Sequence, residues 1–177
     1  MNITDTTPTE SNLSGLDRKD FQKNINSKKT DLYILKNAQG MEVAVTNYGC
    51  AILSIMVPDK NGKFANVILG HDSIEHVINS PEPFLSTTIG RYGNRIANGK
   101  FTLYGEEHQL TVNNGPNSLH GGPTGFHARV WDAVQPNEST VIFNYTSADG
   151  EEGFPGTLEV RSEERRVGKE CRSRWSP

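Results

Sequence analysis

Short runs of apolar and β-branched residues, separated by turn-forming residues, dominate this chain from about residue 31 onward. Residues 32–36 and 41–46 predict two strands that are joined through Ala-Gln-Gly at 38–40. Residues 51–57 are apolar and β-branched, and they predict a third strand that Pro58 ends.

Later segments repeat this pattern of short strands and turns. Asn61-Gly62 predicts a turn before a strand at 64–69, and residues 73–79 predict one short helical turn. Further strands are predicted at residues 101–103, 106–110, 130–134, 141–146 and 157–160. Because no long segment keeps a period of 3.6 residues, the pattern predicts an all-β sandwich or barrel.

The two ends of the chain differ from this middle part. Residues 1–20 are rich in Thr, Ser, Asn and Asp, and they predict a disordered N-terminal arm. Residues 161–177 contain six basic and three acidic residues and show no strand alternation, whereas residues 1–160 carry 12 basic and 18 acidic residues. The codons AGA TCG GAA GAG CGT CGT GTA GGG would encode the start of this tail and look like a sequencing-library adapter. We therefore expect the domain to cover residues 21–160 and residues 161–177 to be a translated adapter, with a natural basic tail as the alternative.

Composition limits the class of protein. A length of 177 residues fits one domain, and a hydrophobic content of 34% fits a loop-rich β protein. The net charge of −3 comes with no basic face, which argues against nucleic acid, and no apolar run approaches the ~20 residues of a membrane span. Without an apolar leader segment the expected location is cytoplasmic. Cys50 and Cys171 give neither a disulfide pattern nor metal-ligand spacing.

Two glycine-flanked segments contain the candidate chemistry. Ile-Gly-Arg-Tyr-Gly-Asn-Arg-Ile-Ala at 89–97 contains Asn94 and Arg95, and Asn-Ser-Leu-His-Gly-Gly at 117–122 contains His120. Glycine lets a ligand approach the backbone, and Asn, Arg and His offer directed hydrogen bonds to a neutral polyhydroxyl ligand. From the residues alone, plainer roles stay open for both side chains: His120 as a histidine that caps a turn, and Arg95 as an arginine on the surface.

The two segments, in this order, resemble the aldose 1-epimerase (galactose mutarotase) family. Further segments agree with the family: Thr-Asn-Tyr-Gly at 46–49, Val-Pro-Asp-Lys-Asn-Gly at 57–62, Val-Ile-Leu-Gly at 67–70 and Asp-Gly-Glu-Glu-Gly-Phe-Pro-Gly at 149–156. The resemblance runs from about residue 21 to 160. It implies a large antiparallel β-sandwich, present here only in part, with a sugar site on one face.

The resemblance also implies roles for three residues. Asn94 and Arg95 would hold sugar hydroxyls, and His120 would contact the substrate and support the transition state while α and β anomers of a free aldohexose interconvert. The family's catalytic base, a Glu, and its acid, a second His, lie in a C-terminal half that we do not find here. We therefore expect a truncated and inactive fragment of an isomerase that is monomeric when complete.

Other polar and aromatic residues have simpler interpretations. Arg91 is expected to be structural, and Trp131 to lie in the core. The acidic residues Asp149, Glu151 and Glu152 fit a solvated turn better than a catalytic pair, and Phe154 is a candidate pocket wall. The remaining histidines, which lack zinc-site spacing, are His71, His76, His108 and His127.

Cofactors and rival functions complete the expectations. No phosphate-binding loop is present, so no cofactor is expected for the chemistry, and the resemblance leaves a bound Ca²⁺ open. A non-catalytic carbohydrate-binding β-domain is one alternative. A hexose-6-phosphate 1-epimerase is another, but it would need a cationic cluster near the site, and Arg95 lacks an obvious one.

Overall fold

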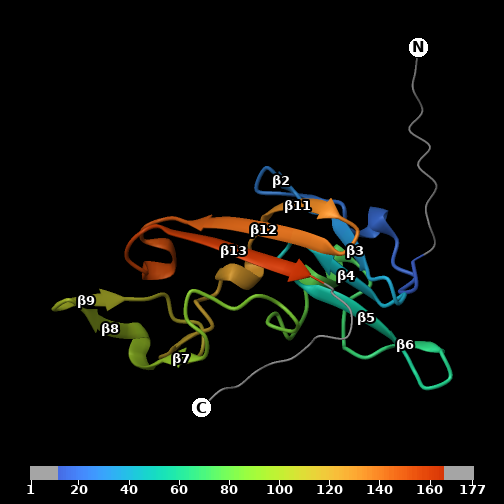
Figure 1. The fold of residues 1–177 in the computed structure, drawn as a ribbon. Coiled ribbons are helices and arrows are strands. Elements are labelled where there is room, and N and C mark those ends of the chain that lie inside the picture. The colour runs from blue at the N-terminus through green and yellow to red at the C-terminus, as the bar shows by residue number, and fades with distance from the viewer. Residues whose placement is uncertain (1–11, 166–177) are drawn as a thin grey trace, which may run out of the picture.

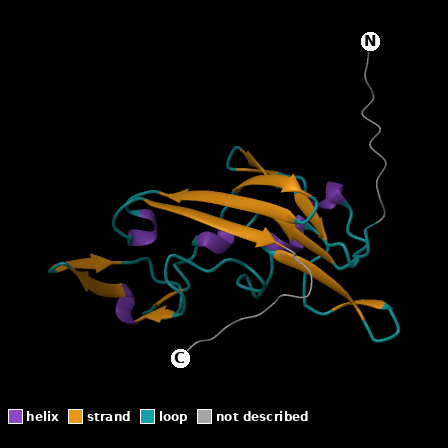
Figure 2. Ribbon diagram, viewed as in Figure 1, coloured by secondary structure: helices purple, strands orange, loops and turns teal. Residues whose placement is uncertain are grey.

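Two antiparallel sheets form the body of the protein (Figure 1 and Figure 2). The computed structural model describes residues 12–165. The first sheet has the order β3-β4-β5-β6, with bounds β3 Leu32–Lys36, β4 Glu42–Thr46, β5 Ile52–Pro58 and β6 Phe64–Asn66. The second has the order β11-β12-β13, with bounds β11 Asp132–Asn137, β12 Thr140–Ser147 and β13 Leu158–Arg165.

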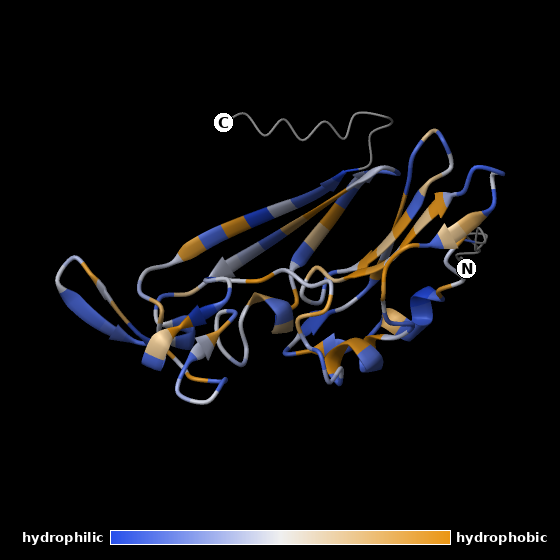
Figure 3. Cartoon of the chain, turned by 90° about the horizontal axis from the view of Figure 1, so that it is seen from below, coloured by the Kyte–Doolittle hydropathy of each residue, from blue (hydrophilic) through white to orange (hydrophobic). Residues whose placement is uncertain are grey.

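Strand β4 lies between two apolar layers, and each of its five residues is buried. Val43 and Val45 belong to the cluster that includes Trp131, Val141 and Phe143, so they pack toward the second sheet. Successive side chains point to opposite faces of a strand. Apolar and polar residues accordingly alternate at the start of β13 (Figure 3). The two sheets thus enclose one core, which confirms the predicted all-β sandwich.

The other face of the first sheet is covered by two short helices. Ala44 packs in a second cluster with Phe21 of η1 (Arg18–Phe21) and Ile74 of α1 (Ile74–Ile78). Ser73 caps α1, because its side chain accepts a hydrogen bond from the His76 N–H at 3.3 Å. The short helical turn predicted at 73–79 is confirmed.

Small elements connect the larger ones. The β8–β9 hairpin extends away from the two sheets (Figure 1). The paired short strands are β1 Asn24–Ile25 with β2 Lys28–Lys29, β7 Arg95–Ile96 with β10 Ser118–Leu119, and β8 Lys100–Leu103 with β9 Glu106–Gln109. The remaining 3₁₀ turns are η2 Ala97–Gly99, η3 Phe126–Ala128 and η4 Glu151–Gly153. Among the described residues no helix is long and apolar enough to cross a membrane.

The start of β11 differs from the prediction for a local reason. Val130 forms an isolated bridge with Tyr48, and the Trp131 N–H donates to the Asn47 carbonyl at 2.8 Å. These two residues therefore pair with the β4–β5 connection, and β11 begins only at Asp132. Trp131 is fully buried, as expected for a core residue.

Residues 12–20 pack on the first sheet, which corrects the predicted disordered arm for this part of the chain. The buried carboxylate of Glu42 accepts hydrogen bonds from the backbone N–H groups of Leu13 at 2.9 Å and Ser14 at 3.0 Å. A buried charge needs such partners, so the β4 strand fixes this segment. Residues 1–11 lie outside the described part of the chain.

The C-terminal boundary also differs from the prediction. Strand β13 continues through Arg161 to Arg165 and pairs with β12, with Arg161 opposite Asn144 and Arg165 opposite Thr140. Backbone hydrogen bonds form with any non-proline side chain, so a charged segment can extend a strand. The adapter origin of residues 161–177 stays a prediction, and residues 166–177 lie outside the described part.

The extension of β13 leads to a test with two shortened chains. Cross-strand pairs contribute roughly 0.2–1 kcal/mol each, so a chain ending at Val160 should melt at least about 2 °C below one ending at Arg165. Thermal unfolding followed by circular dichroism measures the difference. Equal melting temperatures would show that residues 161–165 add nothing to the sheet.

Candidate functional site

The structure brings together the three predicted site residues Asn94, Arg95 and His120. Strands β7 and β10 pair so that Arg95 lies opposite Leu119, and the His120 N–H donates to the Asn94 carbonyl at 3.0 Å. The two glycine-flanked segments therefore lie side by side, although 26 positions separate Asn94 from His120.

The imidazole of His120 has one nitrogen engaged by the backbone. Its Nδ1 accepts a hydrogen bond from the Asn94 N–H at 2.9 Å. In the neutral ring the proton must then reside on Nε2, which makes this nitrogen a donor. His120 and Asn94 both have left-handed backbones, with φ of 54° and 70°, a conformation in which Asn and His are enriched. The neutral His120 ring can therefore offer a ligand only a donor, through Nε2.

The guanidinium of Arg95 is held by two neutral amide oxygens. Its Nε donates to Asn114 Oδ1 at 2.8 Å, and Nη1 donates to Asn94 Oδ1 at 3.3 Å. Within residues 12–165, Nη2 has no hydrogen-bond partner, and no carboxylate pairs with this cation. Arg95 and Asn94 are exposed, so the charge and the free donor are open to a ligand.

Two asparagines that the sequence analysis missed support the site. Asn114 orients Arg95, whereas Asn113 accepts from the Leu119 N–H at 2.7 Å and donates to the Leu119 carbonyl at 3.0 Å. The Asn113 side chain thus pairs with the chain next to His120 as a strand would. The Asn-Asn-Gly turn at 113–115 was a visible signal, but its partners are set only by the fold.

Glycines in these loops permit contact between backbones. A Cβ on Gly121 would lie 1.8 Å from the Gly90 carbonyl oxygen, and one on Gly125 would lie 2.7 Å from the same atom. A Cβ on Gly90 would meet the Phe126 ring at 2.1 Å. The predicted purpose of the glycines in the two segments, approach of a ligand, is therefore corrected for Gly90 and Gly121: they allow backbones to touch, as does Gly125 just beyond the second segment.

Arg91 is structural, as predicted. Its Nε donates to Ser147 Oγ at 2.9 Å, and its terminal nitrogens donate to the carbonyls of Pro155, Ser147 and Ala148 at 3.0, 2.9 and 2.8 Å. Its guanidinium also lies 6.0 Å from the centroid of the Phe154 ring. Phe154 is buried between Arg91 and Phe101, so it is a packing residue and not the expected pocket wall.

The acidic loop has structural partners. Glu151 accepts from the Tyr145 hydroxyl at 2.6 Å and lies 3.5 Å from Arg129 Nε. Glu152 accepts from the Thr124 N–H at 2.9 Å and so reaches the loop that follows His120. Burial, followed by the hydrogen bond to Glu151, raises the pKa of Tyr145 to about 12. Glu151 and Glu152 are thus half-buried and engaged, unlike the expected solvated turn, whereas Asp149 is exposed as expected.

The remaining candidates form no metal centre. In the part of the chain that the structure describes, no three His, Cys, Asp or Glu side chains are grouped to hold a metal ion. His76 contacts Asp72 at 2.5 Å on the surface, and His108 stacks on Phe101 at 5.2 Å. Burial raises the pKa of the Cys50 thiol, and Cys171 lies outside the described residues. The Ca²⁺ expectation stays a prediction.

His127 and His120 both contact the ring of Phe84. The centroids of Phe84 and His120 are 4.7 Å apart, and those of Phe84 and His127 are 4.6 Å apart, both edge-to-face. His127 is buried, and burial followed by the nearby charge of His120 lowers its pKa. Glu152 and a hydrogen bond to the Pro123 carbonyl oppose this shift, whereas Arg129 adds to it.

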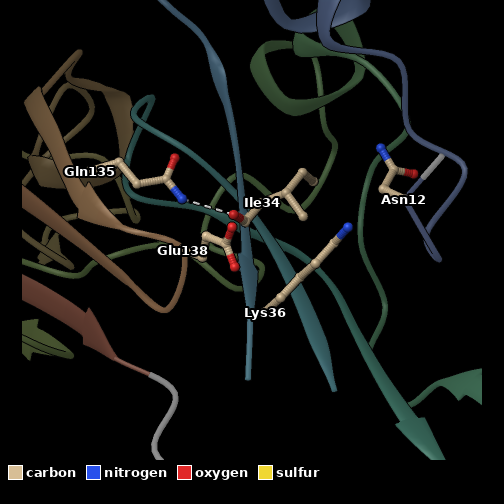
Figure 4. A pocket seen from close by; sticks show the side chains of 5 residues that line it. All are labelled: Asn12, Ile34, Lys36, Gln135 and Glu138. Atoms are coloured by element: carbon tan, nitrogen blue, oxygen red, sulfur yellow. Dashed lines mark hydrogen bonds between the residues drawn. The ribbon is translucent and has the colours of Figure 1, made fainter. Parts of the chain in front are cut away.

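A small cavity lies elsewhere in the fold. It has a volume of about 170 Å³ and is lined by Asn12, Ile34, Lys36, Gln135 and Glu138 (Figure 4). The Gln135 side chain donates to the Ile34 carbonyl at 2.8 Å across it. It shares no residue with the site of Asn94, Arg95 and His120.

Replacement of Gly121 tests the contact between the loops. Gly121→Ala places a methyl group against the Gly90 carbonyl at a φ of 88°, so it should lower the free energy of unfolding by about 3 kcal/mol or more. Gly156→Ala is the matched control, because its φ is 75° and nothing lies within 4 Å. It should cost only about 1–2 kcal/mol of backbone strain. Equal losses in urea unfolding would contradict the contact.

The buried His127 predicts a pH dependence of stability. The folded state keeps this ring neutral below its ordinary pKa of 6.5, so the unfolded chain binds more protons there. The free energy of unfolding should therefore fall as the pH falls through about 6.5, and His127→Asn should reduce that slope. Urea titrations across this range measure it, and identical slopes for the two proteins would refute the assignment.

Comparisons with known proteins all point to one family. The aldose 1-epimerase family model matches residues 31–165. Galactose mutarotase of Bos taurus is 42% identical over 120 residues, which cover 68% of this chain and 34% of that protein. Aldose 1-epimerase of Escherichia coli (strain K12) is 42% identical over 127 residues, or 72% of this chain and 36% of that protein.

Solved structures give the same result. An aldose epimerase homologue from C. elegans superimposes with a TM-score of 0.71 at 30% identity, covering 76% of this chain and 41% of that one. Galactose 1-epimerase from Lactobacillus acidophilus gives 0.69 at 30% identity, covering 80% and 41%. The chain thus matches only about a third of the length of the curated relatives. Over that part, sequence and fold agree, and the chain belongs to the aldose 1-epimerase family.

Proposed function

We propose that this chain is the part of an aldose 1-epimerase that binds the sugar, and that the complete enzyme interconverts the α and β anomers of free aldohexoses such as galactose and glucose. The observation that carries the proposal is that two unpartnered donors belong to side chains that Asn94 holds together. Arg95 Nη2 and His120 Nε2 belong to groups joined through Asn94, which bonds to both. Two fixed donors suit the hydroxyl and ring oxygens of a sugar.

The chemistry assigns different tasks to different parts of the protein. A base removes the proton of the C1 hydroxyl, an acid protonates the ring oxygen, the ring opens, and rotation about C1–C2 precedes closure on the other face. Arg95 and Asn94 would hold hydroxyls in both anomers. His120 would donate from Nε2 to an oxygen on which negative charge increases, so its contribution would be larger in the transition state. The acid and the base are expected outside the described residues.

The surroundings of Arg95 favour a neutral sugar over a sugar phosphate. A phosphate dianion is bound by several charged donors. Arg91 donates to Ser147, Ala148 and Pro155, and Arg129 pairs with Glu151, so neither is available to join Arg95. Neither of these two arginines therefore supplies the second cation that the hexose-6-phosphate alternative requires.

A chimera tests the proposal against a binding-only domain. The chain up to Val160 would be continued with the corresponding remainder of the Escherichia coli aldose 1-epimerase, and the optical rotation of fresh α-D-galactose followed. The 177-residue chain should give no rate above buffer, whereas the chimera should be active. Arg95→Ala in the chimera should lower kcat/KM by about 10–150-fold, the equivalent of losing one charged hydrogen bond of about 1.5–3 kcal/mol. His120→Gln should lower kcat more than it raises KM.

Arg18→Ala is the matched control for Arg95→Ala. Arg18 pairs with Asp31, far from β7 in the sequence and near the start of β3. Its replacement should leave kcat/KM unchanged. A folded, inactive chimera that still binds galactose would favour the binding-domain alternative, and an active chimera indifferent to Arg95→Ala would remove Arg95 from the site.

A further inference from the structure

Phe84 is the common neighbour of two histidine rings. It lies between α1 and the 89–97 segment, and its ring contacts His120 at 4.7 Å and His127 at 4.6 Å between centroids, with interplanar angles of 63° and 60°. Edge-to-face pairs at such distances are favourable and directional. Phe84 thus couples the half-buried His120 ring of the site to a buried histidine of η3.

We propose that Phe84 and His127 are positioning residues, which hold the His120 imidazole so that its Nε2–H is presented to the ligand. This inference rests on the proposed function for its meaning, but the ring geometry that it describes can be tested without a sugar. Neither residue belongs to the glycine-flanked segments that the sequence analysis singled out.

The hydrogen bond to Nδ1 does not by itself fix the orientation of the His120 ring, so a second contact is needed. The bond from the Asn94 N–H to Nδ1 selects a tautomer, but the terminal torsion of a histidine is broad. A half-turn of the ring about this torsion would exchange Nε2 with Cε1 and Nδ1 with Cδ2. It would therefore break the bond from the Asn94 N–H that selects the tautomer. The Phe84 ring, packed edge-to-face against the imidazole, opposes that rotation. The hydrogen bond and the ring contact together define one orientation.

His127 in turn holds Phe84, which is only half-buried. His127 is 4% exposed, and its Nδ1 is unpartnered among the described residues. Its backbone also packs closely against Gly49, where a Cβ would lie 2.2 Å from the His127 carbonyl oxygen. A rigid ring at this place gives Phe84 a fixed surface to pack against.

The test is the tautomer of His120 in the 177-residue chain, measured by imidazole ¹H–¹⁵N correlation spectra above the pH range in which histidines titrate. In the wild type we expect a single form with the proton on Nε2. In Phe84→Leu the ¹⁵N chemical shifts of both ring nitrogens should move toward the average of the two tautomers. In Phe84→Tyr, which keeps the aromatic ring, they should stay at the values of the single form. His127→Asn should have the same effect as Phe84→Leu, and His127→Phe should reverse it.

A matched control exists in the β8–β9 hairpin. Phe101→Leu removes another phenylalanine–histidine contact, that with His108 at 5.2 Å, but it should leave the His120 spectrum unchanged. An unchanged His120 spectrum in Phe84→Leu, or an equal change in Phe101→Leu, overturns the proposal. If Phe84→Leu does not fold, nuclear Overhauser contacts from the Phe84 ring to both imidazoles of the wild type decide, and their absence also overturns it.

The chimera separates this inference from the proposed function. In an active chimera, Phe84→Leu should lower kcat by about 10-fold or more, with little further loss when it is added to His120→Gln. Additive losses would contradict action through His120. An inactive chimera whose His120 tautomer still depends on Phe84 would reject the proposed function and keep the positioning role.

Discussion

Backbone contact between the two glycine-flanked loops is the constraint on which the site depends. The carbonyl of Gly90 lies so close to Gly121 and Gly125 that no side chain fits there, and it accepts the Phe126 N–H at 3.2 Å. This contact places β7 against β10, and therefore Arg95 and Asn94 beside His120. A displacement of either loop would separate the donors that, in the proposed function, bind one sugar.

The loops are in turn fixed to the sandwich by aromatic packing and by Arg91. Phe126, Trp131 and Tyr145 contact one another with centroid distances of 5.3–5.7 Å, and Phe126 also fills the space beside Gly90. Arg91 joins the first loop to the end of β12 through carbonyl groups. Rigid elements thus position exposed polar side chains, an arrangement suited to recognition by hydrogen bonds.

Charge is distributed so that one cation near the site stays uncompensated. Arg129 is paired with Glu151 and Arg91 is surrounded by carbonyls, whereas Arg95 contacts only neutral amide oxygens in the described residues. Neutral partners orient the guanidinium without cancelling its charge, so it keeps its strength as a donor to a ligand. The acidic loop, which the sequence offered as a catalytic alternative, instead supports Tyr145 and Thr124.

The sequence by itself determined the fold class, most strands and the helical turn at α1, because alternation, turn residues and the Ser73 cap are local signals. It also predicted Asn94, Arg95 and His120 as site residues, through motifs whose order along the chain is distinctive, and a structural role for Arg91, which the contacts of Arg91 bear out. Only the tertiary structure decided what lies beside them. Asn113, Asn114, Phe84 and His127 are distant in sequence from the residues they support, and no local pattern encodes such pairs. Two further outcomes depend on a neighbour that the chain reaches only after folding. Gly90 and Gly121 allow contact with the facing loop, and β13 continues into a charged segment because β12 lies beside it.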